Sequence, residues 1–262
     1  MSMIVTDADK AAFVAGLAVS DAQITAISKL AQGTDEWLAS RVGRMTTSNW
    51  GAAAGHNKYD PHGEELLKRM LGLSAFKGNA ATRYGSEHED VAAELYTLTA
   101  QARVLMNDWS SIAEDVTVAD YEAAGAMAGA GASMGADPAD YRVEYPGLCV
   151  WGEHPWAGGS PDGIIHTASG EVGLLEIKCP FRKLLYGDIP HYYYDQIQGT
   201  MGILGLPWCD FVVYTPTKTS VQRFDFDAAY FEGELYPAVH DFYWNRYLPA
   251  QILANRGLGV GG

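Results

Sequence analysis

The sequence has few cysteines, and it lacks any long apolar run. Its three cysteines, Cys149, Cys179 and Cys209, show no metal-ligand spacing, and their odd number favours buried thiols in a reducing compartment. No apolar run approaches the ~20 residues that cross a bilayer. The N-terminus also lacks a basic region followed by an apolar core, which argues against a secretion signal. We therefore expect a cytoplasmic protein without a membrane segment.

Basic residues are also scarce, because 18 Lys and Arg stand against 32 Asp and Glu, for a formal net charge of −14. This balance argues against a protein that coats nucleic acid through a diffuse basic field. It does not exclude a nuclease, since a nuclease can confine positive charge to one channel and neutralise its acidic site with bound metal. Hydrophobic residues make up 48% of the chain, enough for one large domain with a sizeable core.

The most informative stretch, residues 158–180, is typical of a β-hairpin. A short apolar run at 164–166 is followed by turn residues and by a second apolar run that stops before Pro180. Strand residues two apart point to the same face, so we expect Glu176 and Lys178 to lie side by side. Burying such a pair is costly unless each group has a partner.

Asp162 stands at the mouth of the first strand, so two carboxylates and a lysine would converge at one end of the hairpin. Mg²⁺ accepts one or two carboxylates together with waters and substrate phosphates. A neighbouring lysine can polarise the attacking water or steady a phosphate oxygen. The alternative is a hairpin with a solvated Glu–Lys pair, but Ser-Pro-Asp-Gly upstream and the apolar flanks favour a metal site.

Residues 33–55 predict two short helices. Thr34 is the expected N-cap of the first, which carries Trp37 and Arg41 on one face at i, i+4. The second would begin at 46–48, where hydroxyls and free backbone N–H groups form an anion site to which Arg41 adds a phosphate contact. A plain helix-turn-helix with a surface arginine is the alternative, and this stretch alone does not decide between the two.

Two later helices each place a polar residue on an apolar face. In the helix over 82–100, Glu89 faces inward and needs a partner, unless a half-turn offset leaves it solvated. Glu87 is the competing candidate and points elsewhere. In the helix over 189–205, Gln196 lies among aromatic residues and can bond a phosphate or the attacking water, or it is an ordinary surface amide.

The remaining segments set the domain organisation. We expect a helical N-terminal extension over 1–32, with caps at Thr6 and Ser20, and a flexible tail over 256–262. Between them we expect a single domain over 33–255 that contains an Ala/Gly-rich insertion at about 107–145. This domain would end with a hairpin of strands at 209–214 and 221–226 and an aromatic closing helix over 228–255. The insertion is inferred because 123–136 lacks large side chains for a core.

Together these motifs resemble the PD-(D/E)xK nuclease fold, and more narrowly the lambda-exonuclease or YqaJ-type viral recombinase family. Trp37-x-x-x-Arg41-x-Gly43-x-x-Thr46-x-Ser48 resembles the family's opening motif, and Gly85-x-x-x-Glu89 its second. Ser160-Pro161-Asp162-Gly163 and Leu175-Glu176-Ile177-Lys178-Cys179-Pro180 resemble its catalytic hairpin, and Tyr193-x-x-Gln196-x-Gln198 its late helix. The resemblance implies an α/β (α+β) fold with a restriction-endonuclease-like core, in which helices flank a central mixed β-sheet.

The resemblance also implies roles for the matching residues. Glu89, Asp162, Glu176 and the carbonyl of Ile177 would hold two Mg²⁺ ions, for which Mn²⁺ can substitute. The catalytic set would comprise these three acids with Lys178 and Gln196, the last two acting on the attacking water. The 5′-phosphate of a DNA end would be bound by Arg41, Ser48 and Ser160, and candidate DNA contacts are Tyr193, Arg182 and Lys183.

The implied activity is Mg²⁺-dependent 5′-to-3′ hydrolysis of one strand of linear double-stranded DNA, leaving 3′ overhangs for phage-type recombination. The implied partners are DNA ends, further copies in a ring-shaped homotrimer and a single-strand annealing protein, in a phage or prophage setting. One alternative is a PD-(D/E)xK endonuclease, or a nuclease for single strands or RNA, without 5′-end dependence. The other is a non-catalytic DNA-end-binding or protein-binding module, which is disfavoured because no position of the metal site is lost.

Overall fold

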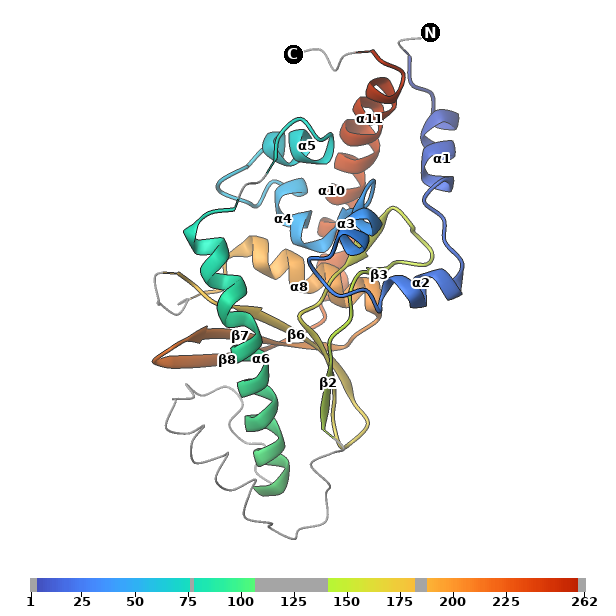
Figure 1. Ribbon diagram of the computed structural model, residues 1–262. Helices are drawn as coiled ribbons and strands as arrows, with labels where there is room; N and C mark the ends of the chain where they lie inside the picture. The colour runs from blue at the N-terminus through green and yellow to red at the C-terminus, as the bar shows by residue number, and fades with distance from the viewer. Residues whose placement is uncertain (1–3, 76–77, 107–140, 182–187, 259–262) are drawn as a thin grey trace.

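The structure is a computed structural model that describes residues 4–75, 78–106, 141–181 and 188–258 (Figure 1). Most of the expected Ala/Gly-rich insertion, at 107–140, lies outside the described residues. So do the DNA-contact candidates Arg182 and Lys183 and the last four residues of the expected tail.

Both expected N-terminal helices are present. α1 (Asp7–Ala15) begins at the predicted cap Thr6, and α2 (Asp21–Ile27) begins at the predicted cap Ser20, each with a capping box. They end earlier than residues 17 and 31, where the apolar pattern alone placed their ends.

The connection after α3 (Asp35–Arg41) differs from the sequence prediction. Thr34 caps α3 as expected, but the next residues form a short strand, β1 (Met45–Thr46), and then a single 3₁₀ turn (Thr47–Asn49). The helix that follows, α4 (Trp50–Ala53), has only four residues. The hydroxyls at 46–48 therefore lie on a strand and a tight turn, and not at the N-terminus of a long helix, because Met45 and Thr46 pair in parallel with 157–158.

Two sheets form the centre of the molecule. The larger has the order β2-β5-β6-β7-β8, formed by β2 (Arg142–Glu144), β5 (Gly163–His166), β6 (Val172–Lys178), β7 (Trp208–Thr215) and β8 (Lys218–Asp225). β6 and β7 run parallel, and the other neighbours are antiparallel. The smaller sheet joins β1, β4 (Ala157–Gly159) and β3 (Cys149–Val150) in the order β1-β4-β3. The predicted mixed sheet and both predicted hairpins are confirmed, whereas β2 falls where the sequence indicated the end of an insertion.

Helices cover both faces of the larger sheet (Figure 1). α6 (Ala80–Met106) packs on the face that carries Ile177, and α8 (His191–Leu204) packs through Ile197 on the face that carries Leu174. β7 is buried along its whole length, as expected for a strand covered on both sides. The end of the β5–β6 hairpin thus lies between two helices.

The aromatic closing helix is also confirmed. It consists of α9 (Ala228–Tyr230), α10 (Tyr236–Asp241) and α11 (Leu248–Asn255), joined by the π-helical turns Phe231–Leu235 and Phe242–Tyr247. Its aromatic rings pack around Trp50 and Trp156 in the molecule's core, so they are structural and do not form a ligand box. α5 (Glu64–Met70) packs against the Phe242–Tyr247 turn, and α1 lies beside α11.

Close packing between α4 and α8 depends on Gly51. A Cβ atom at this position would lie 2.5 Å from the Cβ and 2.7 Å from the Cα of Tyr192, so the clash involves backbone. We therefore expect Gly51→Ala to lower the free energy of unfolding by ~1–3 kcal/mol, measured by urea denaturation. Gly233→Ala is the control, since nothing lies within 4 Å of its added Cβ. Equal denaturation midpoints for the two variants would contradict the close approach of the helices.

Candidate active site

Asp162, Glu176 and Lys178 meet at one end of the β5–β6 hairpin. The backbone N–H of Ile177 donates to Asp162 Oδ2 at 2.6 Å, and Lys178 Nζ donates to Glu176 Oε1. The side chain of Glu176 is 1% exposed and that of Lys178 is 19% exposed. This burial excludes the alternative of a solvated Glu–Lys pair.

α8 adds Gln196 and Tyr193 to this group. Gln196 Nε2 donates to the same Glu176 Oε1 at 2.6 Å. Lys178 Nζ lies 5.0 Å from the centroid of the Tyr193 ring, within range of a cation–π contact. Lysine and glutamine therefore hold one oxygen of Glu176 from two different elements.

Glu89 completes the cluster from α6, where its carboxyl group interacts electrostatically with Asp162 and Lys178. Glu87, the competing candidate, is exposed. Burial, with the negative charge of Asp162, raises the pKa of Glu89 to about 7 and that of Glu176 to about 8. Burial alone would lower the pKa of Lys178, but the Glu176 and Asp162 carboxylates outweigh it and raise that pKa above its ordinary value. We call Glu89, Asp162, Glu176, Lys178 and Gln196 the acid cluster.

The acid cluster fits a divalent cation. Glu176 Oε2 is buried and has no hydrogen-bond partner among the described residues. Leaving a buried polar atom unpaired costs about 1–3 kcal/mol, and more for a charged group. Three carboxyl groups also lie together with a single lysine, and their oxygens are ligands of the kind that Mg²⁺ and Mn²⁺ bind.

A second group lies around Arg41. Its Nη1 donates to Ser160 Oγ at 3.1 Å and its Nη2 to Thr46 Oγ1 at 3.0 Å, while the guanidinium lies 4.3 Å from the centroid of the Trp37 ring. The hydroxyls of Thr46 and Ser48 are 3.3 Å apart. The structure thus brings together the three residues predicted for phosphate binding, with Thr46 between them. We call Arg41, Thr46, Ser48 and Ser160 the Arg41 group.

The charge of Arg41 has no carboxylate partner in the described part of the chain, since its side-chain contacts are neutral hydroxyls and the Trp37 ring. Burial lowers the pKa of Arg41 to about 10, so the group is still charged at neutral pH. A half-buried cation whose hydrogen bonds go only to hydroxyls is ready to pair with an anion.

Chain connectivity joins the two groups. Ser160 and Asp162 are two residues apart in the segment between β4 and β5, so the Arg41 group borders the acid cluster. The side-chain amide of Gln32 fixes this segment by donating to the carbonyl of Pro161 at 3.0 Å. Sequence reasoning missed Gln32, because a single amide 129 residues from its partner leaves no local pattern.

A pocket of about 480 Å³ opens beside Arg41 between α3, α5 and α11. Arg44 and Arg69 also line it, and no aspartate or glutamate does. In a chain with a formal net charge of −14, positive charge is concentrated at this place. The pocket suits a polyanion that reaches the Arg41 group.

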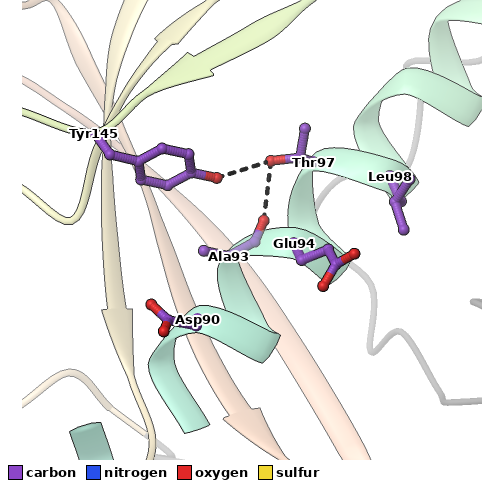
Figure 2. A pocket seen from close by; sticks show the side chains of 6 residues that line it. All are labelled: Asp90, Ala93, Glu94, Thr97, Leu98 and Tyr145. Carbon is purple, nitrogen blue, oxygen red and sulfur yellow. Dashed lines mark hydrogen bonds between the residues drawn. The ribbon is translucent and has the colours of Figure 1, made fainter. Parts of the chain in front are cut away.

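A second pocket, of about 350 Å³, lies between α6 and Tyr145 (Figure 2). Thr97 donates to the carbonyl of Ala93 at 2.9 Å and lies 3.4 Å from the Tyr145 hydroxyl. Asp90 and Glu94 line this pocket, and no lysine or arginine does. Its acidic wall would repel a phosphate, so we do not assign it to nucleic acid.

A group that sequence reasoning missed lies between the loop after α4 and the first turns of α8. His56, His191 and Asp195 offer ligand atoms that all lie within 4.8 Å of one another, and they could hold a metal ion. Within the described residues it is this group, and not the three predicted carboxylates, that meets this spacing. The i, i+4 pair of His191 and Asp195 could have been noticed in the predicted helix, but His56 is too distant in the sequence.

The fold places the chain among α/β proteins with a mixed sheet between helices. Residues 36–207 match the YqaJ-like viral recombinase domain, and the chain belongs to this family. An alkaline exonuclease from Laribacter hongkongensis, LHK-Exo, shares 23% sequence identity and a TM-score of 0.57 over 86% of this chain and 97% of its own. The complex of LHK-Exo with dAMP gives a TM-score of 0.58 at the same identity and coverage. At this identity the likeness shows the fold. No match was found among curated proteins.

The part of the chain that the structure describes contains no candidate membrane-spanning helix. None of the helices there combines the length and the apolar character that a membrane span requires.

Proposed function

We propose that the protein is a Mg²⁺-dependent exonuclease that degrades one strand of linear double-stranded DNA from its 5′ end. The observation that carries this proposal is the adjacency of two groups, the acid cluster and the Arg41 group, joined through residues 160–162. Membership of a viral recombinase family and a fold like that of an alkaline exonuclease solved with dAMP support it.

In this proposal Glu89, Asp162, Glu176 and the carbonyl of Ile177 hold the metal, as two Mg²⁺ ions or Mn²⁺ in their place. Bound metal would supply Lewis-acid stabilisation of the phosphate oxygens and of the attacking water. The unpartnered Oε2 of Glu176 supports this assignment, because a cation would satisfy it. The Ile177 N–H fixes Asp162 in position through its 2.6 Å hydrogen bond.

Lys178 orients the attacking water or steadies a phosphate oxygen. Its raised pKa keeps it protonated at neutral pH, so it serves better as a fixed positive charge than as a base. Gln196 bonds the same Glu176 oxygen and holds the carboxylate from the α8 side. Tyr193, whose ring lies against Lys178, is a candidate contact for the DNA strand.

The Arg41 group makes hydrolysis depend on a 5′ end of the DNA. Arg41, Ser48 and Ser160 bind the 5′-phosphate, and Thr46 aligns the guanidinium for this contact. Anchoring the end next to the acid cluster presents the first phosphodiester bond for hydrolysis. The product would be a 3′ overhang for single-strand annealing, with a ring-shaped trimer and an annealing protein as partners in a bacterial host infected by or carrying the phage.

The direct test uses linear duplex DNA labelled at either the 5′ or the 3′ end, with Mg²⁺ or with EDTA. We expect Mg²⁺-dependent release of the 5′ label as a mononucleotide, while the 3′-labelled strand shortens stepwise. A covalently closed plasmid should stay intact. Cleavage of the plasmid would instead favour the endonuclease alternative, and release of the 3′ label first would contradict the proposed direction.

A further inference from the structure

His56, His191 and Asp195 have the spacing of ligands around one small ion. His56 Nδ1 is 3.0 Å from Asp195 Oδ2, and His191 Nε2 is 3.8 Å from Asp195 Oδ1. Ligands bound tetrahedrally at ~2.0–2.1 Å lie roughly 3.4 Å from one another. The two distances, each to a different oxygen of Asp195, bracket this value. The imidazole rings are stacked nearly parallel, at an interplanar angle of 8° with centroids 4.0 Å apart, so one ring would have to rotate for both nitrogen atoms to point at one ion.

The surroundings hold these three side chains in place. The Asp195 side chain is fully buried, whereas His56 is 29% and His191 is 53% exposed, which leaves an open side for an ion and a water ligand. The loop with His56 is fixed because the backbone N–H groups of residues 56 and 57 both donate to the carbonyl of Gly51. The Tyr230 hydroxyl donates to Asp195 Oδ1, as an outer partner of this carboxylate.

We propose that His56, His191 and Asp195 bind a transition-metal ion of the zinc class, at a site separate from the acid cluster. Two imidazole nitrogens and one carboxylate suit Zn²⁺ and its neighbours, while Mg²⁺ prefers oxygen ligands throughout. The ion replaces the proton between His56 Nδ1 and Asp195 Oδ2.

The ion's role is structural, because it ties the loop after α4 to the first turns of α8, with Tyr230 of α9 bonded to the same carboxylate. α8 also carries Gln196, the residue after Asp195, so the zinc-class site anchors the helix that reaches the acid cluster. The two sites differ in donor chemistry and share only this helix.

The test is metal binding by the full chain after chelator treatment, in buffer without Mg²⁺. We expect one Zn²⁺ per chain, a rise in melting temperature on adding Zn²⁺, and the visible absorption of tetrahedral Co²⁺ when Co²⁺ is the probe. His191→Gln should abolish all three signals. Because the His191 side chain is half exposed, we expect this variant to fold normally. Tyr230→Phe should weaken Zn²⁺ binding roughly 10-fold, as the loss of an outer partner does.

Two control variants make the result specific. His62→Gln removes an exposed histidine a few residues after His56 and should bind Zn²⁺ as the unaltered chain does. Asp162→Asn alters the acid cluster and should also keep Zn²⁺, so failure of the proposed nuclease activity would not affect this outcome. Zn²⁺ uptake by His191→Gln equal to that of the unaltered chain, or loss of uptake in Asp162→Asn, would overturn the proposal and leave a hydrogen-bonded cluster without metal.

Discussion

Replacement of either Asp162 or Lys178 by alanine is expected to abolish phosphodiester hydrolysis, by roughly 10³-fold or more, while binding to duplex ends persists. Asp162 sits centrally in the acid cluster, between the Ile177 N–H and Glu89. Lys178 is the cluster's only cation and bonds Glu176. Each variant removes a group to which the proposed mechanism gives a role at the reacting phosphate, but it leaves Arg41 and its pocket intact. Hydrolysis is measured by release of a 5′ label, and binding by fluorescence anisotropy in EDTA.

Asp90→Ala is the matched control for the loss of a carboxylate. Asp90 follows Glu89 on α6, but it is exposed and lines the acidic pocket beside Tyr145. This variant should hydrolyse DNA at the rate of the unaltered chain. Full activity in purified, folded Asp162→Ala would remove the acid cluster from the mechanism, whatever the behaviour of the control.

The hairpin could be predicted from the sequence because its determinants are local. Alternation over 172–178 sets which side chains share a face, Pro180 follows the strand's end, and Gly170 takes the positive φ of 85° that the turn needs. The pairing of β5 with β6 follows directly from this short connection. Glu89 could be placed on the inward face of α6 for a similar reason, since helical periodicity is also local.

Other features depend on contacts between distant segments, which no local pattern records. Thr46 and Thr47 are adjacent hydroxyl residues that suggest a helix start, yet the parallel pairing of β1 with β4 draws Thr46 into a strand. β2 lies at the end of the segment that composition marks as an insertion, yet it pairs with β5. His56 meets Asp195 over 139 residues of sequence, so its partner could be found only from coordinates.

Arg41→Ala is expected to remove the preference for 5′-phosphorylated over 5′-hydroxyl ends. The guanidinium is charged, and its described hydrogen-bond partners are the neutral hydroxyls of Ser160 and Thr46, so a terminal phosphate would be its counter-ion. Hydrogen bonds to charged groups contribute about 1.5–3 kcal/mol. Hydrolysis of 5′-phosphorylated ends should therefore fall by roughly 10- to 100-fold, with little change for 5′-hydroxyl ends.

Two further variants separate the hydrogen-bonding geometry of the Arg41 guanidinium from its positive charge. Arg41→Lys keeps the charge but loses the paired N–H groups, so it should restore only part of the phosphate preference. Arg69→Ala removes a positive charge from the wall of the same pocket without touching Ser160 or Thr46. It should weaken binding of both kinds of end equally and lower the salt dependence of binding. If Arg41→Ala behaves as Arg69→Ala does, Arg41 contributes only general attraction for DNA, and the 5′-phosphate must be bound elsewhere.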